Sequence, residues 1–134
     1  MACILVVDDD LDILKTFKRD LTNQGHHVIC AATASEALQH STRTRPDLVL
    51  LDIGLPGSMD GIELCRQLRS NPSSATIPIL FVTVSNDIES KTAAFDAGAD
   101  DYLVKPFDLQ ELNLRVKVLL ARDRFHSAHE SNLN

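Results

Sequence analysis

Short apolar runs that end on polar residues constrain the fold of this chain more than any other feature. Four runs are followed at once by polar side chains, which are Asp8 and Asp9, Asp52, Thr83, and Lys105. Continuous apolar runs are typical of strands that helices cover on both faces of a parallel sheet. The carboxyl ends of such strands line one crevice in which ligands bind. We therefore expect three carboxylates, a hydroxyl and an ammonium to meet at one edge of a sheet.

The segments between the apolar runs have the length and period of helices. Apolar residues recur every three or four positions between residues 11 and 21, between 62 and 68, and between 109 and 119. With a further run near residue 28, strand and helix alternate five times. This alternation predicts an α/β fold, a doubly wound five-stranded parallel sheet that is flanked by five helices.

Length and charge limit what the chain can be. Its 134 residues suffice for one domain, and its net charge of -6 argues against direct binding of a nucleic-acid backbone. Cys3, Cys30 and Cys65 show no CxxC spacing and fit reduced thiols of a cytoplasmic protein. We see neither a signal-peptide pattern nor an apolar segment of the ~20 residues that cross a bilayer, so we expect no membrane partner.

Local signals indicate where several helices and loops begin or end. Asp10 and Asp108 are well placed to cap helices, and Gly98 follows a helix where a left-handed residue is common. The Lys105–Pro106 bond stands where a cis peptide is plausible. After Arg124 the helical period is lost. We therefore expect one domain over residues 1–124 and a flexible tail or linker start over residues 125–134.

The three carboxylates suit a divalent metal and a phosphoryl group. At about 4 Å and an effective dielectric of about 20, each pair of like charges repels by roughly 4 kcal/mol, so a cation is expected to offset them. Asp8 and Asp9 suit Mg²⁺, although one of them could instead cap a helix. Asp52 can act as a nucleophile toward phosphorus, although it could instead be a turn residue. Thr83 and Lys105 could bind phosphoryl oxygens.

Five separated motifs resemble the receiver domain of bacterial two-component response regulators, closest in character to the OmpR/PhoB-like subfamily. The motifs lie, in the family's order and spacing, at residues 6–10, 51–56, 59–61, 82–83 and 98–107. The resemblance extends from about residue 2 to about residue 123. It implies a flavodoxin-like receiver fold with strand order 2-1-3-4-5.

The resemblance implies that Asp52 accepts a phosphoryl group from the phosphohistidine of a sensor histidine kinase or a phosphotransfer protein. It also implies a Mg²⁺ ion, for which Mn²⁺ can substitute. Asp9, Asp52 and the backbone carbonyl of Gly54 would hold the ion, and Asp8 would act through a metal-bound water. A domain of this kind is not an enzyme with a separate substrate, since it assists only its own phosphorylation and dephosphorylation.

The resemblance further implies a conformational switch. Lys105 would pair with the phosphoryl group, Thr83 would move to bond it, and Tyr102 would turn inward; Tyr102 could also be merely a half-buried tyrosine. In the subfamily, charged residues pair across a phosphorylation-promoted homodimer. The corresponding residues here are Lys91, Asp100, Asp101, Glu111, Arg115 and Arg122. An ordinary solvated surface would explain these charges as well.

Three features depart from the family pattern. Val84 stands where the family usually has a smaller residue, and Gly54 is small where many members carry a larger side chain. The loop around Ser58 is one residue longer than the commonest spacing, so we expect an altered loop and an intact site. One alternative is a receiver-like interaction module that no longer uses a phosphoryl group. Another is a phosphohydrolase of the haloacid dehalogenase type, which would need an acidic pair after Lys105. No glycine-rich nucleotide motif follows the first strand.

Overall fold

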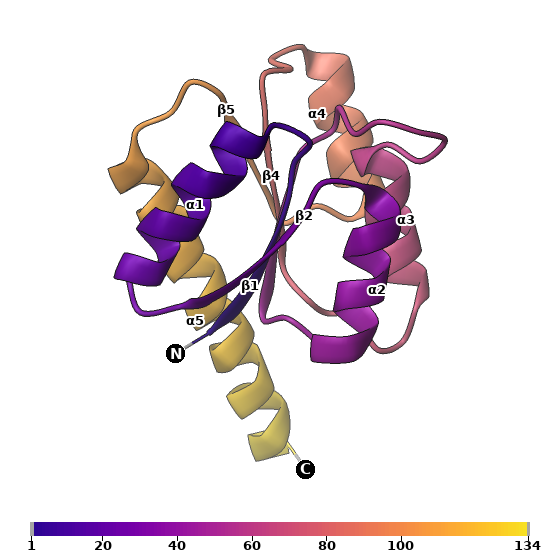
Figure 1. Cartoon of the computed structure of the whole chain (residues 1–134). Helices are drawn as coiled ribbons and strands as arrows, with labels where there is room; N and C mark the ends of the chain where they lie inside the picture. Colours follow the sequence, from indigo (N-terminus) through magenta and orange to yellow (C-terminus); the bar gives the residue numbers. More distant parts are fainter. Residues whose placement is uncertain (1, 134) are drawn as a thin grey trace.

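The computed structural model describes the backbone of residues 2–133 and the side chains of residues 2–122 (Figure 1). The strands are β1 (Cys3–Val7), β2 (His27–Ala31), β3 (Leu48–Leu51), β4 (Ile79–Thr83) and β5 (Asp101–Val104). The helices are α1 (Leu11–Asn23), α2 (Ala34–Thr44), α3 (Gly61–Ser70), α4 (Ile88–Ala97) and α5 (Leu109–Leu133). All strand pairs are parallel, in the order β2-β1-β3-β4-β5, which confirms the predicted fold.

The helices form two layers, one on each face of the sheet (Figure 1). Helices α1 and α5 cover one face, where Phe17 packs among residues such as Leu50 and Leu112. Helices α2, α3 and α4 cover the other, where Leu64 packs among residues such as Phe81. Successive strand residues alternate between the two cores, so every strand position from Ile4 to Val7 is buried. This double cover explains the unbroken apolar runs.

Helix ends follow their capping residues. The Asp10 side chain accepts bonds from the backbone of α1, as predicted, and Asp108 accepts a bond from Gln110 N. Gly98 ends α4 with a φ of 113°, and the Lys105–Pro106 bond is cis. Helix α5 continues as backbone to Leu133, past the expected boundary at residue 124. Side chains beyond residue 122 lie outside the described part, and the division into domain and tail stays a prediction.

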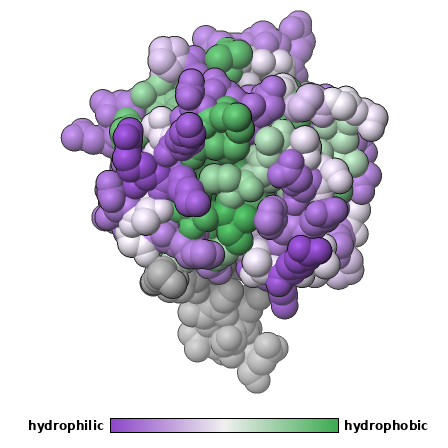
Figure 2. Space-filling view, in the orientation of Figure 1, coloured by the Kyte–Doolittle hydropathy of each residue, from purple (hydrophilic) through white to green (hydrophobic). Residues whose placement is uncertain are grey.

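Strand β2 is an edge of the sheet, and Figure 2 shows hydrophobic residues gathered over it, between α1 and α2. The partly buried Ile29 and Cys30 belong to this strand.

Over the described residues, no helix combines the length and the hydropathy that a bilayer crossing needs.

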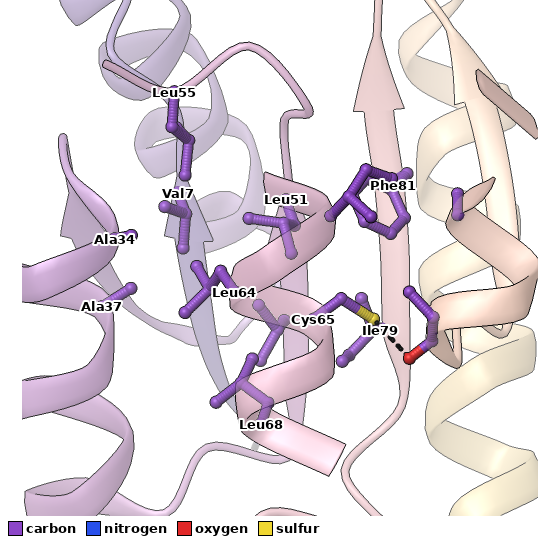
Figure 3. Packing of buried hydrophobic residues seen from close by; sticks show 14 of the residues in the cluster. Val7, Ala34, Ala37, Leu51, Leu55, Leu64, Cys65, Leu68, Ile79 and Phe81 are labelled. Atoms are coloured by element: carbon purple, nitrogen blue, oxygen red, sulfur yellow. Dashed lines mark hydrogen bonds between the residues drawn. The ribbon is translucent and has the colours of Figure 1, made fainter. Parts of the chain in front are cut away.

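Cys65 belongs to α3 and lies in the core between the sheet and helices α2, α3 and α4 (Figure 3). It is fully buried, and its thiol donates to the carbonyl of Ala97 at the end of α4, 3.4 Å away. Burial raises the pKa of Cys65 to about 11. The thiol is therefore part of the packing, and its reactive thiolate form is disfavoured.

We expect Cys65 to resist alkylation by iodoacetamide at pH 8 in the folded chain and to react at once in urea. Because the folded state holds this proton more tightly than the unfolded chain, stability should fall as the pH rises from about 9 towards 11. Peptide mass mapping of labelled cysteines measures the protection. Labelling of Cys65 as fast as that of the partly exposed Cys3 would contradict it.

Candidate phosphoryl and metal site

Strand register brings the predicted site residues to one edge of the sheet. Val7 pairs with Leu51, so Asp8 and Asp52 leave neighbouring strands side by side. The backbone N–H of Asp52 donates to Val7 O at 3.0 Å. On the other side, the N–H of Lys105 donates to Thr83 O at 2.8 Å. The polar residues that follow the apolar runs thus lie together at the carboxyl edge of the sheet.

Three carboxylates form the acidic part of the site. One ligand oxygen from each of Asp8, Asp9 and Asp52 lies within 4.8 Å of the other two. Asp8 is buried and Asp9 is exposed, so the cluster opens to solvent on one side. The backbone N–H groups of Asp10 and Gly54 donate to Asp8 and Asp52, at 2.9 and 3.3 Å. Oxygen ligands with room for water are what Mg²⁺ prefers, so the cluster can hold this ion.

Lys105 places its ammonium between two of these carboxylates. Its Nζ lies 2.6 Å from Asp8 Oδ2 and 3.5 Å from Asp52 Oδ2. Burial opposes the charge of Lys105, but the bonds to Asp8 and Asp52 outweigh burial and raise the pKa above its ordinary value. Burial raises the pKa of Asp8, which the bond to Lys105 lowers only in part. Lys105 is therefore a fixed cation at the acidic cluster.

Thr83 and Tyr102 are joined through the start of the β4–α4 segment. Thr83 is buried, and its Oγ1 accepts a long bond of 3.5 Å from Ser85 N. The Tyr102 hydroxyl donates to Ser85 O at 2.6 Å. Tyr102 as a whole residue is 9 % exposed, and its ring centroid lies 6.2 Å from that of Phe81 and 6.4 Å from that of Phe95. Burial, and next the charges of Asp87 and Asp52, raise the pKa of Tyr102.

Tyr102 is thus buried in this structure, rather than half-buried as the alternative reading of the sequence had it. Its movement as a switch stays a prediction. Val84, next to Thr83, is 72 % exposed, and its effect on access to the site likewise stays a prediction.

The predicted dimer-face residues pair largely within the chain. Arg115 lies 2.7 Å from Asp101 and 3.0 Å from Glu111, and these two carboxylates raise the pKa of its guanidinium. Arg122 lies 3.7 Å from Asp100. Lys91 lies apart from them in sequence, on α4. Any pairing across a dimer would therefore have to compete with bonds that already exist in one chain.

Sequence reasoning missed Arg69 and assigned no role to Gly61. Arg69, in the last turn of α3, donates to the carbonyls of Ala75, Ile77 and Gly98 and to Asp100 Oδ2. Gly61 begins α3 directly against the backbone of Asp52. An arginine or glycine at a helix end is common, and only the fold shows what surrounds it. The Met59–Asp60–Gly61 part of the family pattern was the one signal that pointed to Gly61.

Comparison with known proteins agrees with this fold and identifies the family. The family described as the response regulator receiver domain matches residues 4–117, and the chain belongs to it. It is a receiver, or phosphoacceptor, domain of two-component signal transduction. The chain is 44% identical over 128 residues to the response regulator MprA of Mycobacterium leprae, covering 96% of this chain and 55% of that protein. The chain thus spans about half the length of the curated relatives it matches.

Solved structures show the same fold. A response regulator from Chloroflexus aurantiacus superposes with a TM-score of 0.85 at 44% identity, covering 90% of this chain and 98% of that chain. A CheY-like receiver domain protein from Methanospirillum hungatei superposes with a TM-score of 0.88 at 32% identity, covering 94% and 98%. Both likenesses therefore cover at least 90% of this chain.

Proposed function

We propose that Asp52 is the phosphoacceptor of this receiver domain and that a sensor histidine kinase or a phosphotransfer protein is its donor. A carboxylate oxygen of Asp52 forms the new bond to phosphorus while the bond from phosphorus to the donor's histidine nitrogen breaks. The observation that supports this best is the position of Asp52, beside two further carboxylates and within 3.5 Å of the Lys105 ammonium. The chain assists only its own phosphorylation and dephosphorylation.

Asp9, Asp52 and the backbone carbonyl of Gly54 would hold Mg²⁺, with Mn²⁺ as a substitute, and Asp8 would act through water. The ion supplies positive charge that neutralises phosphoryl oxygens during transfer. The fit rests on the three carboxylates within 4.8 Å of one another, one of them exposed. Lys105 offsets part of their repulsion and leaves an acidic surface for a cation.

Lys105 and Thr83 would carry the signal onward. A phosphoryl group adds charge and strong acceptors at Asp52, which favour charge-assisted bonds from the ammonium and a bond from the hydroxyl. Movement of Thr83 would disturb its contact with Ser85, whose carbonyl also accepts from Tyr102. The phosphoryl group would thereby shift the population of two arrangements of β4, α4 and β5.

Phosphorylation of Asp52 is tested with small donors and intact mass measurement. Acetyl phosphate and phosphoramidate, each with Mg²⁺, should add one phosphoryl group to the wild-type chain and none when EDTA removes the ion. Asp52→Asn should abolish the adduct. Asp96→Asn, at an exposed aspartate of α4, should leave it intact. An adduct that persists in Asp52→Asn would contradict the assignment; no adduct, together with no response to beryllofluoride, would favour the interaction module without phosphoryl chemistry.

We further propose that phosphorylation promotes a homodimer through α4, β5 and α5. Leu114 and Val118 are 61 % and 54 % exposed on α5, on the helix that carries Arg115 and Arg122. An exposed apolar pair beside charges of both signs suits a self-complementary face. No nucleic acid or membrane contact is assigned to this chain, and we expect it in the cytoplasm.

Light scattering with beryllofluoride and Mg²⁺ tests the dimer. The wild-type chain should double in mass, whereas Leu114→Asp should bind beryllofluoride and remain monomeric because it buries a charge in the apolar centre of the face. Thr22→Asp, at an exposed position of α1, should dimerise normally. A wild-type chain that stays monomeric with the mimic bound would count against this face.

A further inference from the structure

Tyr102 has two aromatic neighbours that differ in how deeply they are buried. Phe81 is the register partner of Tyr102 on strand β4, is fully buried, and has its ring centroid 6.2 Å from that of Tyr102 (Figure 3). Phe95 belongs to helix α4, and its ring centroid lies 6.4 Å from that of Tyr102. Both distances are in the range of attractive aromatic pairs. Phe95 is 48 % exposed, so it is the outer of the two neighbours.

The backbone that carries Phe95 is held by the neighbouring helix α3. The Cys65 thiol donates to Ala97 O at 3.4 Å, and the Arg69 guanidinium donates to Gly98 O at 2.9 Å. The N–H of Gly98 donates in turn to Phe95 O at 3.0 Å. The last turn of α4 is therefore fixed, and the ring of Phe95 contacts Tyr102 from a fixed backbone.

The side chain of Tyr102 is held at two places. Its hydroxyl donates to Ser85 O, in the segment between β4 and α4, at 2.6 Å. Its ring lies on β5, an edge strand, and contacts the rings of Phe81 and Phe95. Because Phe81 is fixed in the core and Phe95 lies towards solvent, Phe95 is the contact that an outward movement of the tyrosine would break.

We propose that Phe95 is the positioning residue for Tyr102, a role that rests on the switch function proposed for this tyrosine. The ring of Phe95 holds the ring of Tyr102 inward without a phosphoryl group at Asp52, so the phenol stays on Ser85 O in the resting chain. The exposed part of Phe95 lies on α4, a helix of the proposed dimer face. A second copy that covers Phe95 would stabilise the inward tyrosine, and by reciprocity an inward tyrosine would favour that contact.

The chain contains its own probe of this position, since Tyr102 is its one tyrosine and it has no tryptophan. Acrylamide quenching of tyrosine fluorescence at pH 7 therefore measures the exposure of Tyr102 alone. Loss of an aromatic pair shifts the balance between inward and outward Tyr102 by up to about tenfold, so Phe95→Ala should be quenched more strongly than the wild type. Phe95→Leu, which keeps a large apolar side chain beside the tyrosine, should restore most of the protection.

Ile88→Ala is the matched control, because Ile88 lies on the same helix and is 72 % exposed. It should be quenched as the wild type is. Far-UV circular dichroism checks that each variant is folded, and Phe95→Val, a milder truncation, tests the same difference if the alanine variant is unfolded. A merely structural role of Phe95 would lower stability and leave the quenching of the folded chain unchanged. The proposal is overturned if truncation of Phe95 leaves quenching at the wild-type level, or if Ile88→Ala raises it equally.

Beryllofluoride with Mg²⁺ separates this inference from the proposed function. The switch predicts that the mimic returns Tyr102 of the Phe95→Ala variant inward, so its quenching should fall towards that of the wild type. Strong quenching of this variant both with and without the mimic would support the role of Phe95 and contradict the switch.

Discussion

Gly61→Ala should lower the free energy of unfolding by about 3 kcal/mol, at the upper end of what overpacking one methyl group costs. A Cβ at Gly61 would overlap the carbonyl oxygen of Asp52 and lie 2.8 Å from both the Asp52 carbonyl carbon and Ile53 Cα. All three are backbone atoms, which cannot move without shifting the site. The better helix propensity of alanine offsets at most about 1 kcal/mol of this destabilisation.

Urea unfolding followed by circular dichroism measures this effect, and Gly54→Ala is its matched control. An added Cβ at Gly54 meets nothing within 4 Å, so that variant should stay within about 0.5 kcal/mol of the wild type. Because Gly61 N also donates to Ile53 O at 2.9 Å, the alanine variant should be phosphorylated more slowly by acetyl phosphate. Equal stability of the two alanine variants would refute the close approach.

Arg69→Met should cost about 2–4 kcal/mol, because it leaves several acceptors without their donor. The guanidinium donates to Gly98 O at 2.9 Å, to Ile77 O at 2.6 Å and to Asp100 Oδ2 at 2.8 Å. Its side chain is 20% exposed, so water replaces these bonds poorly. Methionine retains the apolar stem of the side chain. The decrease in stability therefore measures the loss of the hydrogen bonds that the guanidinium donates. Arg69→Lys should recover only part of it, since an ammonium cannot match the planar fork.

Arg66→Met, on the same helix, is the control. Arg66 is 54% exposed and, among the side chains of residues 2–122, pairs only with Glu63 at 3.3 Å, so its loss should cost no more than about 0.5 kcal/mol in the same urea titration. A cost for Arg69→Met as small as that for Arg66→Met would show that the loops around Arg69 hold their positions without it.

The positions of the site residues could be predicted because each residue directly follows a strand of the sheet. Apolar runs buried on both faces admit one fold class, and parallel register then places whatever follows Val7, Leu51 and Val104 at one edge. Asp8, Asp52 and Lys105 therefore needed no contact information. Capping by Asp10 was equally predictable, since it depends on residues two and three positions away.

Contacts between distant loops could not be predicted in this way. Arg69 joins the end of α3, the approach to β4 and the turn before β5, and no periodic pattern encodes such a meeting. The bond from Tyr102 to Ser85 O depends on the backbone path after β4, which the sequence leaves open. The boundary near residue 124 was placed by loss of periodicity, and helical backbone continues past it to Leu133; the division into domain and tail stays a prediction.

The pair of Lys105 and Asp8 joins residues 97 positions apart in the chain. During synthesis, all three carboxylates leave the ribosome well before the lysine does. The residues of β1 and β3 and their carboxylates are thus made first, and the ammonium that lies beside Asp8 and Asp52 is made only after β5. With the role proposed for Lys105, competence for phosphoryl transfer would coincide with completion of the sheet, and an unfinished or truncated product would be a poor competitor for the donor's phosphoryl groups.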